Sequence, residues 1–88
     1  MRTLIVIPVF NEQQFVTRVV QEVRRYADDV LMIDDGSTDD TAAAAQDAGA
    51  NLIRHPQNRG KGAALRTGFN WALEQDYEAI ITMDADGQ

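Results

Sequence analysis

The 88-residue sequence contains no cysteine and a single histidine. The absence of cysteine excludes disulfides and thiolate metal sites, and one histidine leaves few ways to build a zinc site. No apolar run approaches the roughly 20 residues that a membrane-spanning helix needs. Basic residues are also scarce: eight against fourteen acidic ones give a formal net charge of −6. This balance argues against nucleic-acid binding by phosphate neutralisation, so any phosphate-bearing ligand must be met by local cations.

What the chain does contain is typical of a soluble globular protein of at most one domain, with 44% apolar and 25% charged residues. The apolar start, MRTLIVIPVF, continues into NEQQ where a signal peptide would show a small-residue cleavage site. We therefore expect it to form a first strand. The expected location is cytoplasmic, or the cytoplasmic face of a membrane in the intact protein.

Two hydrophobic periods alternate along the chain. Continuous apolar runs predict buried strands, and apolar residues at helical spacing predict the helices between them. Asn11 is expected to cap the first helix, and Ser37 or Thr38 the second. The predicted strands are 3–9, 29–35, 50–55 and a last one within 78–88, and the predicted helices are 11–27, 42–48 and 63–75.

The predicted order, β-α-β-α-β-α-β with short connections, indicates an α/β fold with three layers, in which helices cover a parallel, Rossmann-like sheet. Right-handed crossovers bring every strand-to-helix loop to one edge of such a sheet, where ligands bind. Each loop taken alone could be an ordinary turn or helix cap, but their convergence points to a site. The converging residues are Pro8, Phe10, Asn11 and Glu12 after the first strand, Asp34, Asp35, Gly36 and Ser37 after the second, and Asp84, Asp86 and Gln88 after the fourth.

Several carboxylates at one rim repel one another unless they hold a cation. Asp84 and Asp86 leave the last strand one residue apart, so both can reach the same region. Oxygen ligands without cysteine or histidine favour Mg²⁺ or Mn²⁺, an ion that commonly bridges to a diphosphate. The residues by themselves therefore suggest a metal-dependent site for a nucleoside diphosphate.

The basic loop in NRGKGAALRTGF has two interpretations. The Gly-x-x-x-x-Gly-Lys-Ser/Thr spacing of a phosphate-binding loop is absent, and the loop follows the third strand and not the first. Arg59 and Lys61 either line the donor pocket or belong to a solvated loop. His55, which precedes Pro56, is expected at the surface.

Taken together, VIPVFNE, IDDGSTDDT, NRGKGAALRTGF and MDADGQ resemble the family 2 glycosyltransferases, in particular the branch of dolichol-phosphate mannose synthases and polyprenyl-phosphate glycosyltransferases. The resemblance covers essentially the whole chain and implies a GT-A fold. Residues 1–88 would then form the nucleotide-sugar-binding half of a GT-A domain, with the acceptor half absent. On this interpretation the chain is a fragment.

The resemblance also implies roles for individual residues, which follow the family's motifs position by position. Pro8, Phe10 and Glu12 would line the nucleotide pocket, and Asp35 would hydrogen-bond the base with Asp34 beside it. Asp84, Ala85 and Asp86 match the family's Asp-x-Asp motif: Asp84 would lie toward the ribose and the metal, Asp86 would bind the metal, and Gln88 would be a further metal ligand. No catalytic residue is assigned within the chain.

The function implied is the transfer, with inversion, of a sugar from a GDP- or UDP-sugar to an acceptor such as polyprenyl or dolichyl phosphate, with Mg²⁺ or Mn²⁺ as cofactor. One alternative is a non-catalytic fragment that binds nucleotide or self-associates as a homodimer through an exposed sheet edge. A receiver-like domain with Mg²⁺ is a weaker alternative, because its acidic pair would follow the first strand. A nucleotidyltransferase would show a glycine-rich basic loop at that same place.

Overall fold

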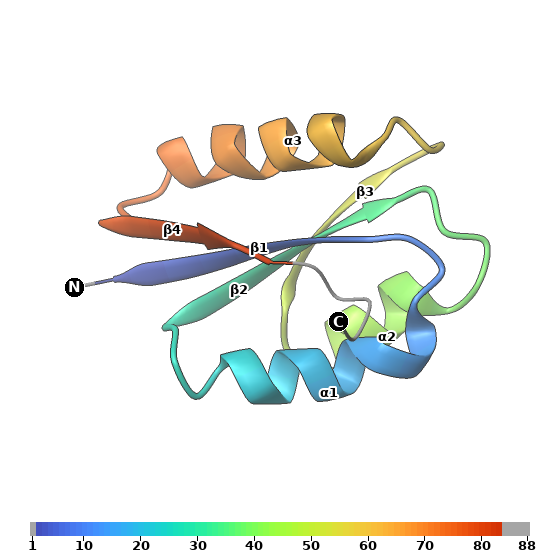
Figure 1. The fold of residues 1–88 in the computed structure, drawn as a ribbon, viewed down its shortest axis with the longest axis horizontal. Coiled ribbons are helices and arrows are strands. Elements are labelled where there is room, and N and C mark those ends of the chain that lie inside the picture. The colour runs from blue at the N-terminus through green and yellow to red at the C-terminus, as the bar shows by residue number, and fades with distance from the viewer. Residues whose placement is uncertain (1, 84–88) are drawn as a thin grey trace.

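The computed structural model describes residues 2–83. Seven elements alternate along this part of the chain as the sequence predicts, and Figure 1 shows a sheet between two layers of helices. The fold class expected from the sequence is confirmed. The elements are β1 (Thr3–Val9), α1 (Gln13–Val23), β2 (Asp29–Asp35), α2 (Thr41–Asp47), β3 (Asn51–His55), α3 (Lys61–Leu73) and β4 (Ala79–Thr82).

The four strands are parallel and lie in the order β3-β2-β1-β4. The chain moves outward from β1 through β2 to β3, and then returns past β1 to place β4 on its other side. Because each crossover is right-handed, this reversal puts α1 and α2 on one face of the sheet and α3 on the other (Figure 1). The point of reversal lies between β1 and β4.

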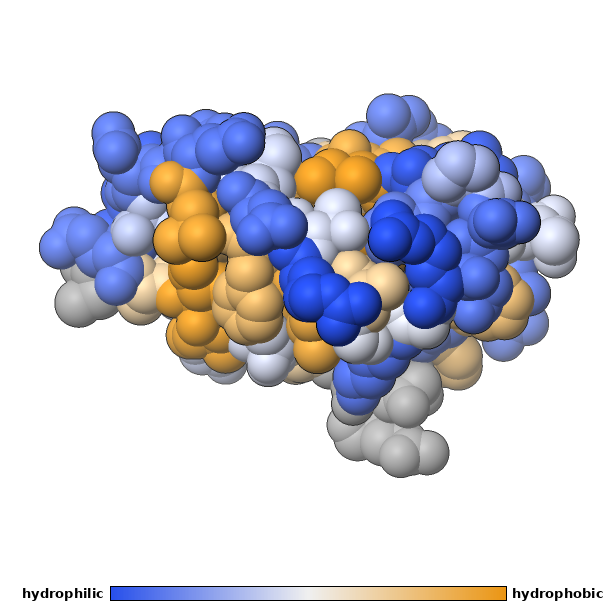
Figure 2. Space-filling model, turned by 90° about the horizontal axis from the view of Figure 1, so that it is seen from above, coloured by the Kyte–Doolittle hydropathy of each residue, from blue (hydrophilic) through white to orange (hydrophobic). Residues whose placement is uncertain are grey.

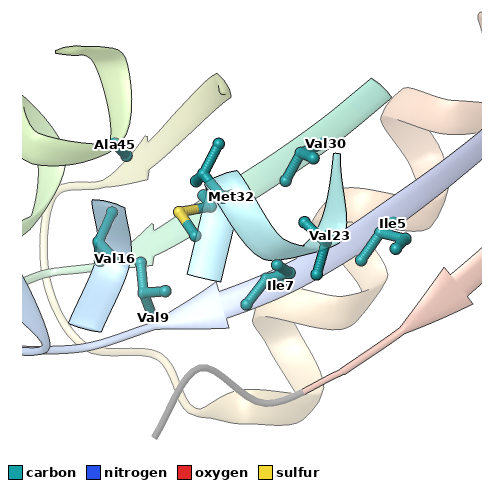
Figure 3. Close-up of a cluster of buried hydrophobic side chains, with 9 residues drawn as sticks. Ile5, Ile7, Val9, Val16, Val23, Val30, Met32 and Ala45 are labelled. Atoms are coloured by element: carbon teal, nitrogen blue, oxygen red, sulfur yellow. The ribbon is translucent and has the colours of Figure 1, made fainter. Parts of the chain in front are cut away.

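Alternating side chains of the two central strands feed two separate cores. One core lies beneath α1 and α2 and contains Ile7 and Met32, among the residues drawn in Figure 3. The other lies beneath α3 and contains Val6 and Ile33. Strands that are buried on both faces read as unbroken apolar runs, which explains why β1 and β2 were recognisable in the sequence.

The edge strand β4 is less well covered than the others. Ile81 is 49% exposed and Met83 is 40% exposed, whereas the aliphatic residues of β1 are buried. Figure 2, which shows the molecule from the α3 side, has apolar surface at the end where α3 finishes, and Leu73 at the end of α3 is 78% exposed.

A polar cluster lies at the amino-terminal ends of the strands. The Arg2 guanidinium lies 2.9 Å from Asp29 Oδ2, to which the Tyr77 hydroxyl donates a hydrogen bond of 2.7 Å. Arg2 also lies 4.6 Å from the centre of the Tyr77 ring. Burial and the bond to Asp29 raise the pKa of Tyr77 to about 12. The cluster ties the chain before β4 to β1 and β2, far from the loops that follow the strands.

The two predicted helix caps are wrong. Asn11 lies one residue further from α1 than a cap, with φ 51°, a conformation that asparagine tolerates. Its Oδ1 accepts a hydrogen bond from Thr38 N–H, so the amide serves the neighbouring loop. At the second helix, Asp39 Oδ1 accepts from Thr41 N–H, and neither Ser37 nor Thr38 caps α2.

Close packing of α3 on the sheet generates the first prediction. A Cβ at Gly68 would lie 2.5 Å from Val6 Cγ1, whereas a Cβ at Gly62 in the same helix would have its nearest neighbour at 3.7 Å. Gly68→Ala should lower the free energy of unfolding by about 1–3 kcal/mol, because the extra methyl overpacks the core. The matched variant Gly62→Ala should raise it by about 0.5 kcal/mol, because alanine is the better helix former. Urea unfolding measures both, and equal effects of the two variants would contradict this packing.

Candidate functional site at the carboxyl edge of the sheet

The loops that follow the strands meet at one edge of the sheet, and β1 and β4 are neighbours there. In open α/β sheets the ligand crevice lies outside the carboxyl ends of the strands, where the strand order reverses. At this point a shallow hollow of about 120 Å³ opens between the strand ends and the start of α3. The predicted nucleotide-binding residues Pro8 and Lys61 both line it, together with Leu65, Thr82 and Met83.

The neighbouring aspartates at the end of β2 point to opposite faces of the sheet, because successive side chains of a strand alternate. Asp35 turns toward α3. Its Oδ1 accepts a hydrogen bond of 3.0 Å from Arg59 N–H, and its Oδ2 accepts one of 2.8 Å from Gly60 N–H. Asp35 therefore holds the two residues that precede α3, with only 4% of its own surface exposed.

Asp34 turns toward the face of α1 and α2 and is fully buried. Its Oδ1 accepts a hydrogen bond of 3.1 Å from Ser37 N–H, which closes the turn after β2. Arg54 Nε lies 3.4 Å from Asp34 Oδ2 and forms an ion pair with it but no hydrogen bond. Arg54 also donates to the Ser37 carbonyl at 3.2 Å, so one guanidinium partly offsets the buried charge and braces the turn.

His55 is buried, with 4% of its surface exposed, so the predicted surface position is wrong. It ends β3 in register with Asp35, and its Nδ1 lies 2.8 Å from Asp35 Oδ1. Its Nε2 lies 2.9 Å from Thr67 Oγ1 on α3. The following Pro56 suggested a loop, but β3 continues as far as His55 and α3 covers it. The alignment of the strand ends carrying Asp35 and His55 was the signal that could have found this contact.

Opposing effects determine the protonation of Asp35. Burial raises its pKa, but hydrogen bonds from His55 and from the N–H groups of Arg59 and Gly60 stabilise the ionised form, and the net pKa lies below its usual value. These two backbone amides are the groups that a phosphate-binding loop would offer to an anion. They are bonded to Asp35 here, which agrees with the absence of a phosphate-loop motif in the sequence.

Gly36 lets the turn after β2 approach the loop between β3 and α3. Its φ is +83°, and a Cβ there would lie 2.6 Å from the backbone nitrogen of Asn58 and 2.6 Å from the carbonyl carbon of Gln57. Only glycine fits both the backbone angle and this distance. The contact places the two loops against each other beside Asp35.

The loop between β1 and α1 is bonded to the turn after β2. Asn11 N–H donates to Ser37 Oγ at 2.8 Å, and Glu12 N–H donates to Thr41 Oγ1 at 2.9 Å. Glu12 Oε1 accepts from Phe10 N–H at 2.9 Å, and Phe10 is 42% exposed. A second hollow of about 280 Å³ lies beside Glu12 and Asp39. Phe10 and Glu12 thus lie at the predicted edge, but Glu12 borders a different hollow from Pro8 and Lys61.

The remaining predicted site residues, Asp84, Ala85, Asp86 and Gln88, lie outside residues 2–83. Within those described residues, no group of three or more His, Cys, Asp or Glu side chains is arranged to hold a metal ion. The expected metal site therefore stays a prediction. Met83, which lines the hollow with Lys61, directly precedes Asp84 in the chain.

The point where the strand order reverses, between β1 and β4, is called the switch point. A parallel sheet with charged loops at this point is typical of nucleotide-binding α/β proteins. The family model described as glycosyl transferase family 2 matches residues 4–88, and the chain belongs to this family. It is 35% identical over 94 residues to polyprenol monophosphomannose synthase of Mycolicibacterium smegmatis, a match that covers 98% of the chain and 36% of that protein. It is also 35% identical over 94 residues to undecaprenyl-phosphate mannosyltransferase of Micrococcus luteus, with 99% and 39% covered.

Solved structures agree with the fold. Glucosyl-3-phosphoglycerate synthase from Mycobacterium tuberculosis in complex with UDP superposes with a TM-score of 0.78 at 25% identity, over 97% of this chain and 34% of that one. The same enzyme in complex with Mn²⁺, UDP and glucosyl-3-phosphoglycerate gives a TM-score of 0.77 at 24% identity, over 96% and 33%. These neighbours have the GT-A fold expected from the sequence.

The chain spans little more than a third of the two curated relatives, 36% and 39% of their lengths. Among residues 2–83, no helix has the length and apolar character needed to cross a membrane.

The hydrogen bonds of Asp35 generate the second prediction. Asp35→Asn should lower the free energy of unfolding at neutral pH by about 2–3 kcal/mol, because an amide accepts these hydrogen bonds less well and its NH₂ opposes a buried donor. The folded pKa of Asp35 is depressed, so its contribution is complete above the unfolded value of about 4 and is lost as the pH falls through the folded value. Urea unfolding between neutral and acidic pH should therefore show a shallower loss of stability in the variant. The same pH slope in both proteins would contradict the assignment.

Proposed function

We propose that this chain is the donor-binding region of an inverting, metal-dependent glycosyltransferase that uses a nucleotide-diphosphate sugar. The observation that carries the proposal is the meeting of Pro8 and Lys61 in one hollow at the switch point of a family 2 fold. The hollow borders Met83, the residue before the Asp84-Ala85-Asp86 motif. Residues 1–88 would accordingly be the nucleotide-sugar-binding half of a GT-A domain.

The proposed nucleotide site divides between a base end and a phosphate end. Asp35 supplies the carboxylate that meets the base, with Asp34 beside it in the chain and the exposed ring of Phe10 and the side chain of Glu12 along the same rim. Lys61 supplies a cation toward the diphosphate, which a chain of net charge −6 must meet locally. Pro8, Asp84 and Ala85 complete the proposed pocket.

Asp84, Asp86 and Gln88 would hold the divalent ion. Their donor set is all oxygen, which suits Mg²⁺ or Mn²⁺. The Mn²⁺ in a solved structural neighbour supports the choice of a divalent metal. When bound, such an ion offsets the negative charge that develops on the departing nucleoside diphosphate.

We further propose a polyprenyl or dolichyl phosphate as the acceptor. The names of the two mannosyl-transferring relatives support this class of acceptor. A lipid phosphate oxygen is already anionic, so its attack on the sugar requires no strong general base, in keeping with the lack of an assigned catalytic residue in residues 1–88. Such an acceptor would place the intact enzyme at the cytoplasmic face of a membrane.

Nucleotide binding tests the proposal directly. Amide ¹H–¹⁵N spectra of the protein, titrated with UDP and with GDP in the presence and absence of Mg²⁺, should show metal-dependent shifts at Glu12, Asp35 and Lys61. The tighter of the two nucleotides identifies the donor class. Asp86→Ala should abolish the metal dependence, because it removes a proposed ligand.

Asp76→Ala is the matched control, because Asp76 is exposed and follows α3 at the opposite edge of the sheet. It should bind like the unchanged protein. Metal-dependent binding that survives Asp86→Ala would remove Asp86 from the site. Absence of binding by either nucleotide would defeat the proposal.

The exposed apolar residues Ile81 in β4 and Met83 directly after it support self-association as a second candidate function. An edge strand offers unpaired backbone groups, and Ile81 and Met83 add apolar surface to it. If β4 pairs between two copies, light scattering should give twice the monomer mass, and Ile81→Lys should return the protein to a monomer. A monomer at all concentrations would count against this candidate.

A further inference from the structure

A line of three side chains crosses the fold behind the proposed nucleotide site. It runs from Asp35 at the end of β2, through His55 at the end of β3, to Thr67 on α3, with contacts of 2.8 Å and 2.9 Å. Asp35 and His55 are each 4% exposed, so water competes little for these contacts. The line reaches the site only through Asp35.

The chemistry of the two ends determines which imidazole nitrogen carries the proton. An ionised carboxylate only accepts hydrogen bonds, so the contact with Asp35 requires a proton on His55 Nδ1. In the neutral imidazole, Nε2 is then an acceptor, and the Thr67 hydroxyl donates to it. Asp35 thereby selects the tautomer, and the Thr67 hydroxyl completes it by donating to Nε2.

Asp35 Oδ1 accepts hydrogen bonds from both His55 and Arg59 N–H, while Oδ2 accepts one from Gly60 N–H. A carboxylate oxygen has room for about two hydrogen bonds, so Oδ2 keeps one acceptor direction within this arrangement. The carboxylate cannot rotate without breaking bonds to β3 and to the start of α3. A fixed acceptor of this kind suits an N–H group of a nucleobase.

We propose that His55 is a positioning residue for the nucleotide site, which orients Asp35 toward the base through its bonds to Asp35 and Thr67. The proposal rests on the proposed function, because it takes Asp35 to be the carboxylate that meets the base. His55 itself touches no ligand, since it lies behind Asp35 and beneath α3.

The test separates affinity for the base from affinity for the phosphates. The probes are UDP, GDP and inorganic pyrophosphate, each with Mg²⁺, in calorimetric titrations of the purified protein. His55→Leu should weaken binding of the preferred nucleotide by about tenfold, the value of one hydrogen bond to a charged group. Pyrophosphate binding should change less than about twofold, because pyrophosphate has no base for Asp35 to meet.

Two variants serve as controls. His55→Asn retains an N–H near the position of Nδ1 and should recover most of the nucleotide affinity. Thr67→Val removes only the hydroxyl, and its nucleotide affinity should fall between those of His55→Leu and His55→Asn. Both keep the proposal testable if His55→Leu fails to fold. Equal losses for nucleotide and pyrophosphate, or no rescue by asparagine, would overturn the positioning role.

Histidine ¹⁵N spectra give a readout that is independent of ligand. They should show His55 protonated at Nδ1, and Thr67→Val should move the Nε2 signal, which loses its hydrogen-bond donor. If the unchanged protein binds neither nucleotide, the proposed function fails. The orientation of Asp35 is then judged from its carboxyl signal and the Gly60 amide signal, which must move in His55→Leu and return in His55→Asn. Signals that stay in place would overturn the inference.

Discussion

The buried carboxylate of Asp35 is the group on which the carboxyl edge of the sheet depends. Taking a carboxylate out of water costs several kcal/mol unless hydrogen bonds replace its hydration. Here the replacements come from His55 and from the backbone of residues 59 and 60, so satisfying one charge draws together β2, β3 and the start of α3. The loops at the switch point take their positions from this arrangement.

The two aspartates of the IDDGS motif thus stabilise the fold, in addition to any role in binding a ligand. Asp34 closes the turn on one face of the sheet, and Asp35 holds the start of a helix on the other. If the motif is interpreted only in terms of ligand binding, these separate structural roles of Asp34 and Asp35 are overlooked. The hydrogen bonds to Asp35 also lower the pKa of its carboxyl group and fix its orientation, at the edge where we propose that a nucleotide sugar binds.

Much of the fold could be predicted because it is encoded locally. Unbroken apolar runs in β1 and β2 reflect burial on both faces, and the helical spacing of α1 reflects burial on one. The caps could not be predicted in the same way. Asn11 looks like a helix cap by residue type, but its amide reaches Thr38, a partner distant in the sequence. Local propensity cannot distinguish between two acceptable uses of one polar side chain.

The sequence by itself determined the order of elements, the family and the edge at which its motif residues gather, because hydrophobic periodicity and motif spacing are properties of neighbouring positions. Only the tertiary structure decided which of those residues face one another. It separated Asp34 from Asp35 across the sheet, placed Pro8 and Lys61 around one hollow, and buried His55 between Asp35 and Thr67. These outcomes depend on strand register and on the close approach of α3, and both arise from contacts between segments far apart in the chain.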